Sequence, residues 1–331
     1  MMVKKLRVVI LGLVVLGVGE PVLAQQEPPT AGDSRISARS IQLERKTGTI
    51  DGTIDLPAGA GHFPIVIIIA GSGPTDRDGN QPGLKNDSLK QLGHGLAAKG
   101  IAALRYDRRG IGKSAAVQPS EENLRFEMLA EDVTAWIKLL RQDRRFSRIG
   151  VIGHSEGSLV GMLAAKQGEA DAFVALAGCG RSAAEVLRWQ LAKNLPKALK
   201  EKCDPILDEL VAGRTVAETP KELAALFRLS AQPYLISYFK YDPSREIARL
   251  EIPVLIVQGT TDLQTPMEDA KLLAKAKKGA QLCVIEEMNH VLKRATTLAE
   301  QKAAYSDPSV PLEPKLVEEV SAFLGKALGK R

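Results

Sequence analysis

Short runs rich in β-branched residues alternate with segments of helical spacing along most of this 331-residue chain. The clearest run is residues 65–70, IVIIIA, which no polar residue interrupts. An uninterrupted run of this kind is typical of a strand buried on both faces of a parallel sheet. Strands that alternate with helices form βαβ units, so the pattern predicts an α/β fold with a mostly parallel sheet flanked by helices.

The same pattern predicts the other elements of the core. Further strands are expected at 101–105, 148–152, 172–177, 253–257 and 282–285. Helices are expected at 87–99, 121–141, 158–166 and 313–328. Residues 40–56 alternate imperfectly around Gly48 and Gly52, which predicts an antiparallel hairpin ahead of the parallel strands.

The alternation stops between residues 179 and 252, where the sequence predicts consecutive helices, for example at 183–199 and 220–229. We interpret residues 179–252 as a helical cap inserted into a core made of residues 40–178 and 253–331. The end of this segment carries an aromatic cluster, which we expect to pack the cap against the core, with substrate contact as the alternative. The cluster consists of Tyr234, Tyr238, Phe239 and Tyr241.

The first 24 residues have the layout of a secretory signal peptide. Three basic residues precede an uncharged apolar run at 8–19, and Val22 and Ala24 precede a cleavage point after residue 24. The run is shorter than the ~20 apolar residues of a spanning helix, and no Cys follows it to carry a lipid. The sequence therefore predicts export, to a bacterial periplasm, without a stable membrane anchor. Polar residues 25–39 are predicted to be a flexible leader.

Composition excludes several classes of protein. Hydrophobic residues make up 44% and charged residues 25% of the chain, which is typical of a folded globular protein rather than a disordered, fibrous or polytopic membrane protein. The net charge of +6 is a small surplus and does not predict a nucleic-acid partner. Cys179, Cys203 and Cys283 form no CxxC pair, so we expect free thiols, with a Cys179–Cys203 disulfide as the alternative in an oxidising compartment. No metal-ligand pattern is present in the sequence.

The most informative motif is residues 149–157, IGVIGHSEG, which places G-x-S-x-G between a predicted strand and a predicted helix. In that context the serine occupies a sharp, strained turn with its hydroxyl exposed, and the flanking glycines prevent clashes across the turn. Ser155 is therefore the candidate nucleophile. The backbone N–H of Glu156, at the start of the helix, is a candidate donor to an oxyanion.

A serine nucleophile needs a base and an acid that orients the base. Of the four histidines, His154 adjoins Ser155 and should diverge from its hydroxyl, His62 precedes the first buried strand, and His94 lies within a predicted helix. His290 follows the predicted strand at 282–285 at its carboxyl end, the edge at which Ser155 also lies. Asp262 follows the strand at 253–257 at the same edge. Ser155, Asp262 and His290 thus occur in the Ser…Asp…His order of α/β-hydrolases, and we expect them to form a triad.

The loop after the first buried strand reads AGSGP from residue 70, and its small residues allow the backbone to approach a substrate closely. The backbone N–H of Ser72 is the candidate second oxyanion donor. Neither this loop nor a second glycine-rich stretch predicts nucleotide binding. Gly71-Ser72-Gly73 lacks the third glycine of the dinucleotide fingerprint, and GIGKS at 110–114 has Asp107 where a phosphate loop needs its first glycine.

These motifs resemble the α/β-hydrolase superfamily, in particular its capped serine aminopeptidase-like hydrolases and carboxylesterases. The resemblance covers residues 40–328 and is carried by AGSGPTDRDGN (70–80), YDRRGIGKS (106–114), GHSEG (153–157), Gly259–Asp262 and Asn289–His290. It implies Ser155 as nucleophile, Asp262 as acid, His290 as base, Ser72 and Glu156 as oxyanion donors, and no cofactor. The sequence departs from many relatives at Ala70, where they carry a histidine, and at Ser158, where they carry a glycine.

The expected function is hydrolysis of small carboxylic esters through an acyl-enzyme intermediate. Two alternatives use the same fold. A peptidase or aminopeptidase acting on short peptides would share the whole triad, so that only the cap and pocket would distinguish it. A non-catalytic binding protein is the other alternative, and the intact set of triad residues argues against it. The charged residues Asp76, Arg77 and 107–109 are expected to form a structural ion network near the same edge of the sheet.

Overall fold

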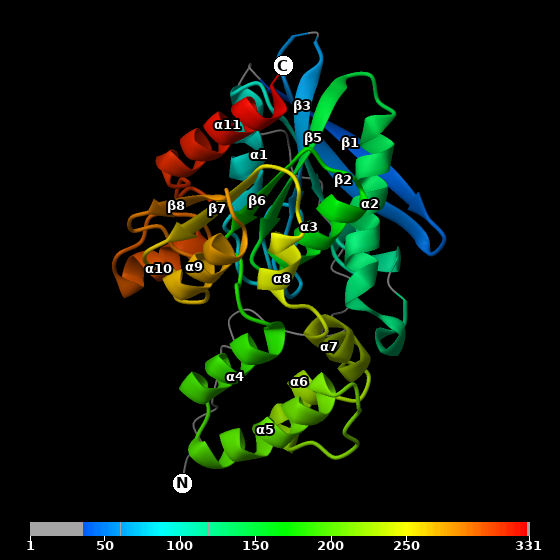
Figure 1. Ribbon diagram of the computed structural model, residues 1–331, viewed down its shortest axis with the longest axis vertical. Coiled ribbons are helices and arrows are strands. Elements are labelled where there is room, and N and C mark those ends of the chain that lie inside the picture. Colours follow the sequence, from blue (N-terminus) through cyan, green and yellow to red (C-terminus); the bar gives the residue numbers. More distant parts are fainter. Residues whose placement is uncertain (1–35, 60, 118, 330–331) are drawn as a thin grey trace.

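The computed structural model describes residues 36–59, 61–117 and 119–329. They form one eight-stranded sheet in the order β1-β2-β4-β3-β5-β6-β7-β8, flanked by helices on both faces (Figure 1). Strands β1 and β2 form an antiparallel hairpin, β2 pairs antiparallel with β4, and all other pairs are parallel. The α/β-hydrolase-like fold predicted from the sequence is confirmed. The strands are Ile36–Arg45 (β1), Gly48–Pro57 (β2), Phe63–Ile69 (β3), Ala102–Tyr106 (β4), Phe146–His154 (β5), Ala172–Leu176 (β6), Val254–Gly259 (β7) and Gln281–Ile285 (β8).

The burial of strand β3 on both faces explains why no polar residue interrupts its sequence. Ile65, Ile67 and Ile69 belong to the core cluster on one face of the sheet, whereas Val66 and Ile68 belong to the cluster on the other face. Each of these five side chains is essentially inaccessible to solvent. Successive side chains of a strand point to opposite faces, so a strand covered by helices on both sides needs apolar residues at every position.

Two layers of helices provide this cover. Helices α1 and α11 pack together on one face, and α2, α3, α8 (Pro243–Ala248) and α9 lie on the other (Figure 1). The helices outside the segment between β6 and β7 are Ser88–Ala98 (α1), Phe126–Arg141 (α2), Glu156–Gln167 (α3), Met267–Ala276 (α9), Leu298–Ser306 (α10) and Pro314–Leu328 (α11), with short 3₁₀ turns at Gly112–Val117 (η1) and Glu121–Asn123 (η2).

The direction in which successive strands are added to the sheet changes at β3. From β3 the chain crosses to β4 on one side, and it then returns to add β5 and β6 on the other side. The loops after β3 and β5 therefore leave the sheet side by side at its carboxyl edge. Such a switch point is the usual ligand-binding crevice of an open parallel sheet, and it brings the loop at 70–74 next to Ser155.

Between β6 and β7 the described chain is helical. The elements are Ala183–Asn194 (α4), Lys197–Val211 (α5), Lys221–Leu223 (η3), Ala224–Phe227 (α6), Gln232–Phe239 (α7) and Pro243–Ala248 (α8). Helices α4 to α7 project from the carboxyl edge of the sheet, in the lower part of Figure 1. The helix predicted over 183–199 is divided in two at Pro196, which lacks the N–H that would continue α4.

An aromatic contact ties this cap segment to the core. The ring of Tyr238 in α7 stacks on Phe126 at the start of α2, with ring centroids 4.3 Å apart. The backbone N–H of Phe126 donates to Ser237 Oγ at 2.8 Å. Tyr234 and Tyr241 complete the cluster around the same ring. The predicted aromatic cluster thus packs the segment against the core, because the stacked rings remove a large apolar area from water.

The amino-terminal predictions fall largely outside the described residues. The proposed signal peptide at 1–24 lies there entirely, as does most of the leader predicted at 25–39. Residues 36–39 of that leader form the start of β1, where they pair with residues 54–57 of β2. In the part of the chain that is described, no helix combines the length and apolarity needed to cross a membrane.

Candidate active site

Ser155 lies at the sharp turn between β5 and α3, with φ 54° and ψ −122°. This region is strained for a residue with a side chain and is found where surrounding structure enforces it. The two motif glycines allow the turn: a Cβ on Gly153 would lie 2.2 Å from the backbone oxygen of Gly157, and one on Gly157 would lie 2.6 Å from two backbone oxygens of the β3 end. The turn therefore has the strained strand-to-helix geometry typical of a nucleophile elbow, with Ser155 at the N-terminus of α3.

Asp262 and His290 meet at the same edge of the sheet, although 28 residues separate them. His290 Nδ1 lies 2.9 Å from Asp262 Oδ2, and the two side chains are 6% and 1% exposed. The other carboxylate oxygen accepts the backbone N–H groups of Gln264 and Thr265 at 2.8 and 2.9 Å. Burial raises the pKa of Asp262, but the interaction with His290 and these hydrogen bonds outweigh burial and hold the pKa below its usual value. Asp262 is therefore an ionised, fixed acceptor for the imidazole.

His154, the residue before Ser155, holds the loop that carries His290. His154 Nε2 donates to the backbone oxygen of His290 at 2.8 Å, and the two ring centroids are 4.9 Å apart. This contact brings the His290 loop against the elbow. Among the described residues, however, no hydrogen bond joins the Ser155 hydroxyl to His290. In enzymes without substrate this bond is often long, and it tightens in the reacting complex.

The buried imidazole of His154 predicts a specific pH dependence of stability. Burial and the neighbouring His290 lower the pKa of His154 from 6.5 to about 4. The unfolded chain therefore binds a proton at this residue between pH 6.5 and 4 that the folded chain does not bind, so the free energy of unfolding falls as the pH falls through this range. Its contribution to that loss between pH 7.5 and 4.5 should be about 2–3 kcal/mol.

The check is urea unfolding of the wild-type protein and His154→Gln at both pH values. The stability advantage of the wild-type protein should shrink by the stated amount at pH 4.5. An advantage that is the same at both pH values would show that His154 is not held neutral by its surroundings.

The loop after β3 brings Ser72 to the elbow. Gly71 is in close contact with Ser155, since a Cβ on it would lie 3.1 Å from Ser155 Cβ. Gly73 has a φ of 75°, which favours glycine. The Thr75 hydroxyl donates to the backbone oxygen of Ser72 at 2.8 Å and fixes the orientation of the loop. Across the loop, Glu156 is the first helical residue of α3, so its N–H has no acceptor within the helix.

Ser72, Ser155 and Glu156 line one cavity of about 20 Å³, which is enclosed by the cap segment. The remaining lining residues are Cys179, Ala183, Val186, Gln190, Tyr238, Gln264 and Thr265. The space is about the volume that one water molecule needs. The predicted nucleophile and both predicted oxyanion donors therefore share one small cavity. Val186, Gln190 and Gln264 carry no sequence signal of a site, because only the folding of the chain brings them to Ser155.

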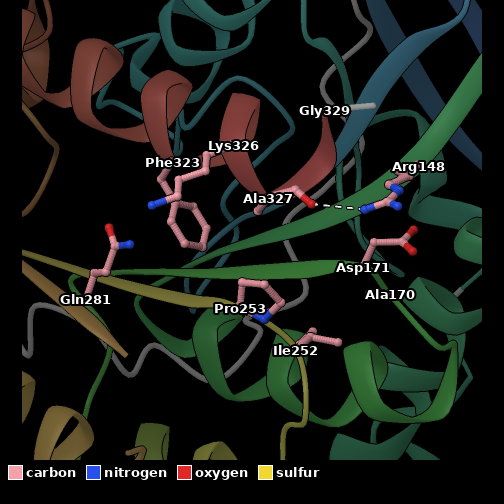
Figure 2. A pocket seen from close by; sticks show the side chains of 10 residues that line it. All are labelled: Arg148, Ala170, Asp171, Ile252, Pro253, Gln281, Phe323, Lys326, Ala327 and Gly329. Atoms are coloured by element: carbon pink, nitrogen blue, oxygen red, sulfur yellow. Dashed lines mark hydrogen bonds between the residues drawn. The ribbon is translucent and has the colours of Figure 1, made fainter. Parts of the chain in front are cut away.

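A larger cavity of about 540 Å³ lies at the opposite edge of the sheet, beside α11 (Figure 2). It is lined at the beginnings of β5 to β8, and Arg148 there donates to the backbone oxygen of Ala327 at 3.3 Å. No candidate nucleophile or histidine is among its described lining residues. We therefore place the candidate active site at the carboxyl edge. No group of three or more His, Cys, Asp or Glu residues in the described ranges is arranged to hold a metal ion.

The charged residues near this edge form ion pairs, most of them well buried. Arg77 contacts Asp51 and Asp107 at 2.5 and 2.7 Å. Arg109 pairs with Asp132. Burial raises the pKa of the neighbouring Asp76 to about 6. The third arginine, Arg108, pairs with Glu156 of the elbow at 2.8 Å, a contact that links this charged network directly to the candidate site. The position of Arg108 among adjacent charged residues predicts an ion network but not this contact with Glu156.

The chain is similar to known proteins in sequence. Residues 85–294, more than half of the chain, match the family described as "Serine aminopeptidase, S33". The match spans Ser155, Asp262 and His290. Esterase EstD of Thermotoga maritima is 30% identical over 257 residues, which cover 76% of this chain and 60% of that protein. The chain thus spans about 60% of the length of this curated relative.

Solved structures resemble the chain in fold. Est1E of Butyrivibrio proteoclasticus, solved with ferulic acid, superposes with a TM-score of 0.59 at 19% identity, covering 88% of this chain and 100% of that one. The Pyrococcus furiosus esterase Pf2001 superposes with a TM-score of 0.55 at 16% identity, covering 94% of this chain and 100% of that one. At these identities the likeness concerns the fold.

Proposed function

Because the chain belongs to the serine aminopeptidase (S33) family of α/β-hydrolases, we propose that it is a serine hydrolase of small carboxylic esters. The single observation that carries the proposal is the pairing of His290 with a buried Asp262 beside the strained Ser155 elbow. A serine in such a turn, with an oriented base nearby, is equipped for acyl transfer. From the layout of residues 1–24 we propose that the protein is exported to a periplasm.

The proposed reaction has two steps and needs no cofactor. Ser155 Oγ attacks the acyl carbonyl carbon while His290 takes the hydroxyl proton, and the resulting oxyanion accepts hydrogen bonds from the N–H groups of Ser72 and Glu156. His290 then gives its proton to the leaving alcohol, and the acyl group remains on Ser155. His290 then takes a proton from water as the water attacks the ester carbon of this intermediate. The bond from the acyl carbon to Ser155 Oγ breaks, His290 returns the proton to Oγ, and the acid is released. Asp262 orients the imidazole and stabilises its charged form.

The small cavity favours esters with short acyl groups. Val186 and Tyr238 enclose it from the cap side, and Ser72 and Ser155 enclose it from the core. A space of about 20 Å³ accepts a methyl-sized group and excludes a long chain unless α4 or α7 moves. The curated relative is named an esterase, which supports the ester over the peptide alternative.

The test is a screen of p-nitrophenyl esters of increasing acyl length against amino-acid p-nitroanilides. We expect kcat/KM to be highest for the acetyl ester and roughly 10- to 100-fold lower for the octanoyl ester, because the pocket discriminates by volume. Faster cleavage of the anilides would favour the aminopeptidase alternative. No turnover of either class, without labelling by a fluorophosphonate, would favour a non-catalytic binding protein.

A further inference from the structure

A single guanidinium contacts both segments that carry the proposed oxyanion donors. Arg108 Nη1 donates to Glu156 Oε1 at 2.8 Å. Arg108 Nη2 donates to the backbone oxygen of Gly73, the residue after Ser72, also at 2.8 Å. One side chain thus connects the loop after β3 to the first residue of α3, across the switch point of the sheet.

The arrangement is well buried and specific to arginine. The Arg108 and Glu156 side chains are 7% and 6% exposed. A guanidinium presents its N–H groups in a rigid planar fork, whereas a lysine ammonium is a single point of charge on a flexible stem. Only the fork can hold the carboxylate and the carbonyl at a fixed separation.

Stability alone is a poor explanation for this ion pair. Among the described residues, Arg108 Nε is buried without a hydrogen-bond partner. A buried pair with an unsatisfied donor is often less favourable than apolar side chains of the same size. The nearby pair of Arg109 with Asp132 differs, since Arg109 Nε and Nη2 both reach the carboxylate and Nη1 donates to Thr47 Oγ1.

We propose that Arg108 is a positioning residue that sets the distance between the Ser72 and Glu156 donors of the oxyanion site. The inference rests on the proposed function, because these donors matter only if an acyl oxyanion forms there. Arg108 itself need not touch the substrate: it holds Glu156 and the Gly73 carbonyl, and these hold the two N–H groups.

The cap segment contacts the same ion pair. Tyr234 of α7 is next to the Glu156 carboxylate, and burial together with this negative charge raises the pKa of Tyr234 well above its usual value. The carboxylate thus lies between the core arginine and a cap tyrosine. A cap that closes over the site therefore also screens the Arg108 bridge from water, which strengthens its charge-assisted hydrogen bonds.

The test compares Arg108→Lys with Arg109→Lys, a change of the same chemistry at the next residue. For short p-nitrophenyl esters, Arg108→Lys should lower kcat roughly 10- to 100-fold with KM within about threefold, because the donors act on the transition state. Binding of a boronic acid, which places an oxygen in the oxyanion site, should weaken in parallel. Arg109→Lys should lower the melting temperature and leave kcat within about twofold of wild type.

A second variant covers the case in which Arg108→Lys folds poorly. The double variant Arg108→Met with Glu156→Leu replaces the pair by apolar side chains, which is often neutral for stability. The double variant keeps the backbone N–H of residue 156 but removes the hydrogen bonds that Arg108 makes to Glu156 and Gly73. We therefore expect kcat to fall in this variant as well. Unchanged kcat and boronate affinity in either folded Arg108 variant would overturn the proposal, as would an equal loss of kcat in Arg109→Lys. Failure of the proposed function is distinct, because wild-type protein itself would then neither turn over esters nor react with a fluorophosphonate.

Discussion

Replacing Ser155 with alanine should reduce kcat for p-nitrophenyl acetate by about 10⁴- to 10⁶-fold, the loss typical of removing a serine nucleophile. The fold should be retained, because the Ser155 hydroxyl forms no hydrogen bond to any described residue and its backbone N–H still donates to Leu176. Alanine at a φ of 54° carries the same strain as serine. The measurement is steady-state kinetics alongside a melting curve.

Ser158 offers a matched control three residues away. Its hydroxyl is buried without a hydrogen-bond partner among the described residues, and it lies in α3 rather than at the turn. Ser158→Ala should therefore keep kcat within about twofold of wild type. If Ser155→Ala retained more than a few per cent of wild-type activity, Ser155 would not be the nucleophile.

Replacing Asp262 with asparagine should lower kcat by about 10⁴-fold while leaving KM almost unchanged. Asn keeps an oxygen for the backbone N–H groups of Gln264 and Thr265, but its amide nitrogen can turn toward His290 Nδ1. The imidazole then carries its proton on the nitrogen that should accept the serine proton. The kinetic readout is kcat and KM for one short ester, with melting temperature measured in parallel.

Thr261, on the same loop, provides the control for Asp262. Its hydroxyl is buried without a hydrogen-bond partner among the described residues. Thr261→Ala should therefore leave kcat within about twofold of wild type. If Asp262→Asn had an equally small effect, the contact with His290 would be structural and the proposed triad would lack its acid.

The order of strands and helices could be predicted from the sequence because the strongest signals for it lie within short segments of the chain. Three such signals are the apolar run of β3, the glycines that flank Ser155, and the apolar stripe of α2. Each depends only on residues close together in the sequence. Element ends were less predictable. The helix predicted over 121–141 is interrupted before Phe126, because Leu124 and Arg125 adopt extended backbone and direct the chain into the contact with α7.

The meeting of Asp262 and His290 was predictable for a different reason. Both follow parallel strands, and the carboxyl ends of parallel strands share one edge, so topology alone brings the two residues together. His154 gave no such signal, because its hydrogen bond to the His290 backbone depends on how the 286–294 loop folds back against the elbow.

The lining of the cavity could not be predicted from pattern. Val186 and Gln190 lie one turn apart on α4, and nothing in the spacing of α4 indicates that this face meets Ser155. The Arg108 bridge is likewise a long-range contact, since Glu156 is 48 residues away along the chain. A stretch of adjacent charges predicts an ion network but not which partner each arginine selects.

The most direct test of the central claim is reaction of the purified protein with a fluorophosphonate, followed by intact-mass measurement and peptide mapping. We expect one adduct per chain, on the peptide that contains Ser155, and none in Ser155→Ala. An adduct that maps to a different residue, or the absence of any adduct in protein that hydrolyses esters, would contradict the assignment of Ser155 as the nucleophile.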